Sequence, residues 1–140
     1  MIKNAYHDHL RKVPLFANLD RQELDALGLL ATELSFPPGQ VLLRQGDRAH
    51  EMFIVLDGTL EVTRDDIYIA DIGPSGFAGE MALLTDSPRN ATVTTKSDVR
   101  LLHVDARSLQ NLLQSIPQIA VKMLPIVAGR AAANSHFASQ

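Results

Sequence analysis

The chain has 140 residues, of which 46% are hydrophobic and 21% are charged, and it contains no cysteine. This length and composition are typical of one globular domain, and the lack of cysteine excludes disulfide bonds, thiolate catalysis and cysteine-based zinc sites. The formal net charge of −3 argues against a nucleic-acid-binding face, which would need a basic stripe. No apolar run approaches membrane-spanning length and the N-terminus is too polar for a signal peptide, so we expect a cytoplasmic protein without membrane insertion.

The N-terminal part of the chain is predicted to be helical. Residues 1–13 are expected to hold a short entry helix. Asp20 and Glu23 have the spacing of a capping box, which predicts the start of a second helix. The apolar positions that follow share one helical face and predict that this helix continues to about residue 31: Leu24, Leu27, Leu30 and Ala31.

The middle of the chain, to residue 104, consists of short β-prone runs that alternate with glycine turns. These runs are residues 41–44, 52–56, 59–63, 67–72, 91–95 and 99–104. Asp57-Gly58, between the second and third runs, predicts a β-hairpin. Many short strands at regular spacing predict an antiparallel β roll of the double-stranded β-helix or jelly-roll type rather than a parallel sheet.

Two helices are predicted at the C-terminal end. Asp105 is expected to cap a helix that runs to about Gln114, and Pro117 suits the start of a last helix. A proline inside a helix removes a hydrogen bond and costs about 3 kcal/mol or more, so we expect the last helix to bend or end near Pro125 and Gly129. This helix lacks the sustained heptads of a long coiled coil, which favours a monomer or a weak dimer.

The stretch from residue 76 to residue 93 has the composition of a ligand site. Gly79 allows a bound group to approach the backbone closely. A helical turn after it would leave N–H groups without partners, and these favour an anion. Arg89 adds a planar fork of donors that matches phosphate oxygens. Glu80 suits this site only if it accepts a hydrogen bond from a neutral donor such as a sugar hydroxyl.

These residues carry a resemblance to a known family. Two runs resemble the phosphate-binding cassette of the cyclic-nucleotide-binding domain family at its spacing: Gly79-Glu80-Met81-Ala82-Leu83-Leu84 and Pro88-Arg89-Asn90-Ala91-Thr92-Val93. The family includes the regulatory subunits of cAMP-dependent protein kinase, the bacterial catabolite activator protein and cyclic-nucleotide-gated channels. The resemblance implies a single domain over residues 1–140, divided into a helical segment (1–31), a β roll (32–104) with its cassette (76–93) and C-terminal helices (105–135).

The resemblance also implies roles for residues of the cassette. Arg89 would contact the exocyclic oxygens of the cyclic phosphate, and Glu80 would accept a hydrogen bond from the ribose 2′-hydroxyl. The backbone N–H groups near Met81 and Ala82 would meet the phosphate. Leu83 would couple the cassette to the moving helices.

The choice of base stays open in the sequence. Asn90 stands where the family has a threonine associated with cGMP or an alanine associated with cAMP, and it is neither; cAMP is favoured over cGMP as the commoner bacterial-type ligand. Ala91 and Thr92 continue the cassette pattern, although Thr92 is explained equally well as a strand residue. An apolar wall beside the base aligns with three residues that plain core packing also explains: Val62, Ile69 and Ala70.

The sequence therefore predicts a cyclic nucleotide sensor or regulatory domain whose C-terminal helices repack on binding. We find no catalytic constellation and expect neither enzymatic activity nor a cofactor besides the ligand. The alternatives are a non-binding interaction module of the same fold and a metal-dependent enzyme on a cupin-like roll. His7-Asp8-His9 is the only hint of a metal, and a solvated terminus explains it better.

The target of the signal is not evident from the sequence. Too few residues follow Pro117 for a helix-turn-helix domain, a kinase or a pore. We therefore expect either a stand-alone sensor that acts on an effector protein or a regulatory domain separated from its effector domain.

Overall fold

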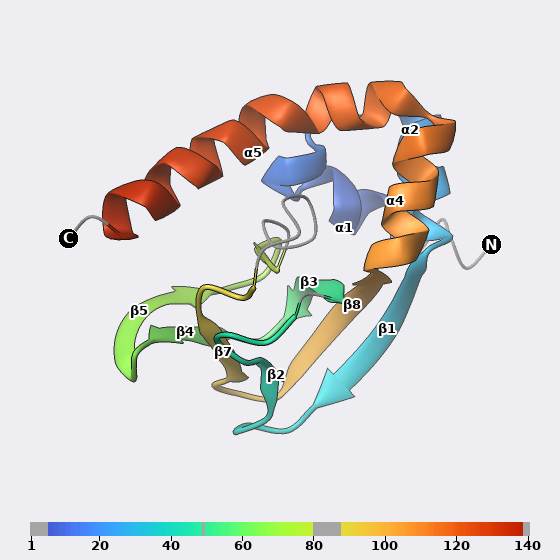
Figure 1. Cartoon of the computed structure of the whole chain (residues 1–140). Coiled ribbons are helices and arrows are strands. Elements are labelled where there is room, and N and C mark those ends of the chain that lie inside the picture. Colours follow the sequence, from blue (N-terminus) through green and yellow to red (C-terminus); the bar gives the residue numbers. More distant parts are fainter. Residues whose placement is uncertain (1–5, 49, 80–87, 139–140) are drawn as a thin grey trace.

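The computed structural model describes residues 6–48, 50–79 and 88–138, and it consists of two antiparallel β-sheets next to a layer of helices (Figure 1). Each sheet has four strands, and helices from both ends of the chain cover one of the sheets. This arrangement confirms the predicted antiparallel β roll with flanking helices. The two sheets do not join into a closed barrel.

Three short helices form the N-terminal part of the helical layer: α1 (His7–Arg11), η2 (Pro14–Phe16) and α2 (Arg21–Gly28). The carboxylates of Asp20 and Glu23 each accept the backbone N–H of the other residue at 2.8 Å, which confirms the capping box. The predicted extension of this helix to Ala31 is wrong, because Ala31 begins strand β1 (Ala31–Phe36) and lies opposite Val104. Pairing with a strand far along the chain outweighs the local helical periodicity here.

The sheet that faces the helices, called the helix-facing sheet below, has the order β1-β8-β3-β6. Its other strands are β8 (Val99–Asp105), β3 (Glu51–Asp57) and β6 (Phe77–Ala78). The outer sheet has the order β2-β7-β4-β5. Its strands are β2 (Val41–Leu43), β7 (Thr92–Thr95), β4 (Leu60–Arg64) and β5 (Ile67–Ile72). All six predicted β runs are strands, and β1 and β6 are additional.

Strand β3 shows how the core is divided. Its side chains alternate between two buried clusters, as the period of two in a strand requires. Phe53 and Val55 pack between the two sheets. Met52, Ile54 and Leu56 pack on the opposite face, under the helices. The helix-facing sheet is therefore buried on both faces, which explains why β3 is apolar at every one of these positions.

The β-hairpin predicted at Asp57-Gly58 is wrong, because β3 and β4 lie in different sheets. β3 pairs with β8 and β6, while β4 pairs with β5 and β7. Gly58 has a φ of +93°, and a Cβ at this position would lie 2.3 Å from the carbonyl oxygen of Asp98. The glycine therefore serves a tight crossing between sheets. A turn dipeptide specifies a change of direction, but pairing over long distance decides which strands become neighbours.

Two helices complete the helical layer at the C-terminal end: α4 (Ala106–Ser115) and α5 (Pro117–Ala138). The Asp105 side chain accepts the backbone N–H of Ser108 at 3.1 Å, which confirms the predicted cap. α5 does not end at Pro125; it continues to Ala138 and follows a curved path in Figure 1. No single helix in the described part of the chain is long and apolar enough to cross a membrane. α4 and the first part of α5 reach that length and composition only when they are taken together, and the angle between them is 117°.

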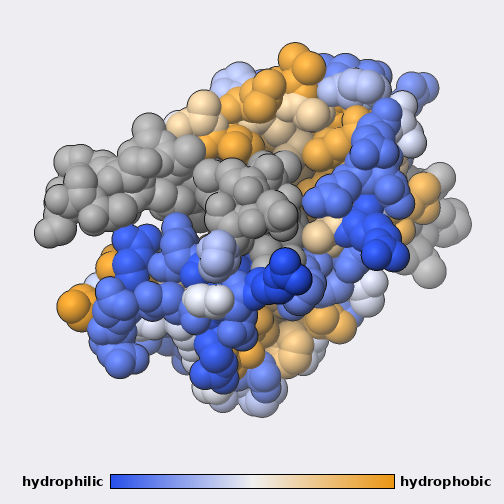
Figure 2. Space-filling model, viewed as in Figure 1, coloured by the Kyte–Doolittle hydropathy of each residue, from blue (hydrophilic) through white to orange (hydrophobic). Residues whose placement is uncertain are grey.

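Up to residue 129, α5 carries apolar side chains both on its packed side and on its solvent side. Ile119 and Met123 are buried against the helical layer. On the solvent side, the side chains of Val121 and Leu124 are 62% and 58% exposed. Figure 2 shows apolar residues gathered over this helix, above a face of the roll that carries more hydrophilic residues. Between Val121 and Gly129, the exposed residues of α5 are thus all non-polar, unlike those on the outer face of an ordinary surface helix.

Candidate functional site

Arg89 lies just before β7 and is held by the fold through both its side chain and its backbone. Its guanidinium is buried, with the residue only 6% exposed. Nη1 donates to the carbonyl oxygen of Gly79 at 2.8 Å, and Nη2 donates to the carbonyl oxygen of Glu51. The backbone N–H of Arg89 donates to the Asp47 carbonyl at 2.9 Å, and its own carbonyl accepts the N–H of Gly46 at 2.8 Å. The position of the guanidinium is therefore determined by contacts within the protein.

Gly79 follows β6 and could not be replaced by another residue without disturbing this arrangement. Its φ of +94° lies in the left-handed region, which favours glycine. A Cβ at this position would lie 2.7 Å from Nη1 of Arg89 and 2.9 Å from the Glu51 carbonyl oxygen. The missing side chain thus makes room for the guanidinium. The backbone at Gly79 is thus closely approached by the arginine of the same site, and the approach of a bound ligand stays a prediction.

The residues that follow Arg89 enter the outer sheet. Asn90 is exposed, and its carbonyl accepts a hydrogen bond from Nε of Arg64 at 3.0 Å. Ala91 is buried. Thr92 is half-buried at the start of β7, and its Oγ1 accepts the backbone N–H of Gln45 at 3.0 Å. The predicted ligand residues Arg89, Asn90 and Thr92 therefore form one continuous segment held from two sides.

The three residues predicted to form the base wall lie on β4 and β5. Val62 is opposite Ala70 in the register, and the two therefore share one face of the outer sheet. Val62 is half-buried and packs against the core between the sheets, whereas Ala70 is exposed. The register shifts between Val62 and Thr63, which leaves the half-buried Ile69 as the extra residue of a β-bulge. Their contact with a base stays a prediction.

The remaining predicted cassette residues lie outside the described part of the chain. The roles given above to Glu80, Met81, Ala82 and Leu83 therefore stay predictions. Among the residues that the structure describes, no three His, Asp or Glu side chains are grouped so as to hold a metal ion.

Four residues that hydrogen-bond to Arg89 or Asn90 were not predicted from the sequence: Gly46, Asp47, Glu51 and Arg64. Three of them act through backbone atoms, so the identity of their side chains gave no signal. Arg64 acts through its side chain, but only the pairing of β4 with β7 brings it close to Asn90.

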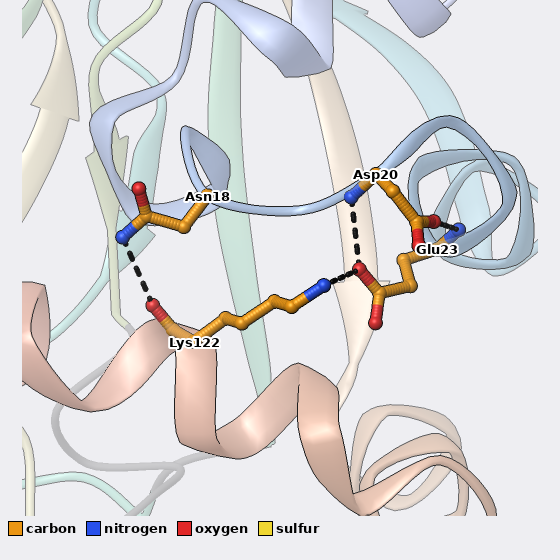
Figure 3. A network of polar contacts seen from close by, with 4 residues as sticks. All are labelled: Asn18, Asp20, Glu23 and Lys122. Carbon is orange, nitrogen blue, oxygen red and sulfur yellow. Dashed lines mark hydrogen bonds and ion pairs between the residues drawn. The ribbon is translucent and has the colours of Figure 1, made fainter.

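A second polar network anchors α5 to the N-terminal helices (Figure 3). Nζ of Lys122 lies 2.6 Å from Oε1 of Glu23, the same oxygen that accepts the backbone N–H of Asp20. Asn18 Nδ2 donates to the Lys122 carbonyl at 3.4 Å. The hydrogen bond with Glu23 raises the pKa of Lys122. One carboxylate thus completes the helix cap and binds the lysine of α5.

This anchor leaves part of the carboxylate unsatisfied. Glu23 is only 4% exposed, and its Oε2 has no hydrogen-bond partner among the described residues.

Comparison with known proteins identifies the type of domain. The family model described as "Cyclic nucleotide-binding domain" matches residues 33–116. The regulatory subunit of cAMP-dependent protein kinase from Dictyostelium discoideum is 30% identical over 125 residues, which cover 84% of this chain and 38% of that protein. A cyclic nucleotide-gated potassium channel from Rhizobium etli is 35% identical over 108 residues, which cover 77% of this chain and 30% of that protein. The chain thus spans between about a third and two fifths of these relatives.

A solved structure of the N-terminal domain of a transcriptional regulator from Streptomyces coelicolor is also similar. It has a TM-score of 0.76 and 33% sequence identity, and the match covers 91% of this chain and 94% of that one. The three relatives differ in what the similar domain is attached to, so the likeness concerns the domain itself.

The packing of Arg89 against Gly79 predicts the effect of adding a methyl group there. Gly79→Ala and the control Gly39→Ala both place alanine at a φ near +90°, but a Cβ at Gly39 meets nothing within 4 Å. We expect each to lose about 1–2 kcal/mol of unfolding free energy from the backbone conformation. Gly79→Ala should lose about 1–3 kcal/mol more, because Arg89 and the Glu51 carbonyl must shift. Urea unfolding measures both values, and equal losses would contradict this packing.

Proposed function

Because the chain belongs to the cyclic nucleotide-binding domain family, we propose that it binds a cyclic purine mononucleotide, with cAMP preferred over cGMP, and acts as a regulatory domain rather than an enzyme. The observation that carries the proposal is the buried guanidinium of Arg89, held by the carbonyls of Gly79 and Glu51. A group of this kind, fixed in the folded protein, binds an anion without first having to be ordered.

The chemistry of Arg89 suits the phosphate of such a ligand. A guanidinium has five N–H donors in one plane and can bind two phosphate oxygens side by side. Charge-assisted hydrogen bonds of this kind contribute about 1.5–3 kcal/mol each. In the proposed complex, Glu80 accepts the ribose 2′-hydroxyl, and the backbone near Met81 and Ala82 donates to the phosphate.

The preference for cAMP rests on the relatives. Asn90 is neither the threonine associated with cGMP nor the alanine associated with cAMP, whereas the Dictyostelium relative is by name cAMP-dependent. The base would lie against β4 and β5, at Val62, Ile69 and Ala70. Ala70 is exposed and Ile69 is half-buried, which leaves apolar surface for a purine to cover.

We further propose that binding shifts the equilibrium between two placements of the C-terminal helices. Leu83 would transmit the movement of the cassette to α4 and α5. In the placement seen here, α5 is anchored by the ion pair of Lys122 with Glu23. A ligand changes this equilibrium only by its different affinity for the two placements. An effector protein or a further domain would respond to the change.

The phosphate contact is tested by titration calorimetry with cAMP and cGMP on protein stripped of nucleotide. Arg89→Ala should weaken cAMP binding at least about tenfold through the loss of charge-assisted bonds. Arg89→Lys should restore little of it, because an ammonium lacks the planar fork. Arg100→Ala, which removes an exposed arginine paired with Asp57 and Glu33, is the matched control. Binding that is equally strong in Arg89→Ala, or absent in the wild type, would contradict the proposed function.

The helix movement is tested by hydrogen exchange with and without saturating cAMP. Backbone amides of α5 around Lys122 should change their exchange rate by at least about threefold, because local opening free energies follow packing. The paired strands β1 and β8 should not change and serve as the internal control. Identical exchange of α5 in a saturated protein would contradict the proposed shift.

A further inference from the structure

The turn between β4 and β5 has a left-handed backbone. Asp65 and Asp66 have φ values of 53° and 65°. Two successive residues of this kind form a tight hairpin turn in which glycine, asparagine and aspartate predominate. Contacts from another part of the chain also hold this turn.

Gln45, in the loop after β2, supplies these contacts. Its Oε1 accepts the backbone N–H of Asp65 at 2.9 Å, and its Nε2 donates to Oδ1 of the same aspartate at 2.9 Å. The amide therefore binds both the backbone and the side chain of one residue, which fixes its orientation. Gln45 is half-buried, although Asp65 is exposed.

The backbone around Gln45 also holds the arginine segment. The N–H of Gln45 donates to Oγ1 of Thr92, and the N–H of the next residue, Gly46, donates to the carbonyl of Arg89. Arg64, the residue before the turn, donates from Nε to the carbonyl of Asn90. The β4–β5 hairpin and the arginine segment are thus joined by three paths: through Gln45, through Arg64, and through the pairing of β4 with β7, in which Thr63 lies opposite Thr92. The path through Gln45 is the one that depends on a paired amide.

We propose that Gln45 is a positioning residue for nucleotide binding, which adjusts the spacing between Arg89 and the β4–β5 hairpin in addition to the pairing of β4 with β7. This inference rests on the proposed function, in which Arg89 binds the phosphate while Val62, Ile69 and Ala70 of β4 and β5 bind the base. A single nucleotide has a fixed distance between these two groups. Any variant that loosens the Gln45–Asp65 pair therefore weakens binding although Gln45 touches neither group.

The experiment swaps the side-chain donor and acceptor of the Gln45–Asp65 hydrogen bond and measures the affinity for cAMP by titration calorimetry. Gln45→Glu brings two carboxylates together, and we expect about a five- to tenfold loss of affinity from the lost bond and the repulsion. In Gln45→Glu with Asp65→Asn, the asparagine donates to the new glutamate. This double variant should return to within about threefold of the wild type. Asp65→Asn should therefore raise affinity only in the Gln45→Glu background.

Gln40→Glu is the matched control for the added charge. Gln40 lies just before β2, and its side chain bonds only to the adjacent Val41 carbonyl among the described residues. We expect the Gln40→Glu variant to bind cAMP as tightly as the wild type does. Gln45→Ala, which removes the pair without adding charge, gives a second test if Gln45→Glu fails to fold, and should weaken binding about two- to fivefold.

The outcomes separate this inference from the proposed function. A wild-type protein that binds neither cAMP nor cGMP would refute both. Wild-type binding with unchanged affinity in Gln45→Glu and Gln45→Ala would refute the positioning role alone. A loss in Gln45→Glu that the added Asp65→Asn does not reverse would also overturn it, because the paired geometry would then be irrelevant.

Discussion

The interaction on which the site depends is the binding of the Arg89 guanidinium by two backbone carbonyls, those of Gly79 and Glu51. It requires Gly79 to lack a side chain and the end of β6 to lie beside the start of β3. It also requires the loop after β2, whose Gly46 and Asp47 pair with the arginine backbone. A buried charge is stable only when polar groups surround it, so the fold and the site are stabilised by the same contacts.

Local features of the fold could be predicted from the sequence, and the partners of its strands could not. The helix caps at Asp20 and Asp105 are local, because each aspartate accepts the backbone N–H of the residue three positions later, and both caps are present. The hairpin predicted at Asp57-Gly58 failed because β3 and β4 find their partners in separate sheets. Ala31 likewise joined a strand rather than a helix through its pairing with Val104. Such pairings depend on distant residues, which periodicity does not report.

The candidate site shows the same division. Arg89 and Gly79 were identifiable because a guanidinium and a missing Cβ carry the chemistry themselves. Glu51 was not, because it contributes a carbonyl oxygen that every residue has. Gln45 and Asp65 were not, because only the folded chain brings the loop after β2 against the β4–β5 turn. Residues whose own side chain, or lack of one, carries the chemistry are thus easier to predict than residues that hold them in position.

We propose that the guanidinium of Arg89, held by contacts within the protein, is the group that binds the nucleotide phosphate. NMR can follow the side-chain Nε–H resonance of Arg89 during a cAMP titration, with the signal assigned through Arg89→Lys. We expect this resonance to change with the fraction of protein bound, while that of Arg100 stays in place. Full saturation with an unchanged Arg89 resonance would contradict this proposal.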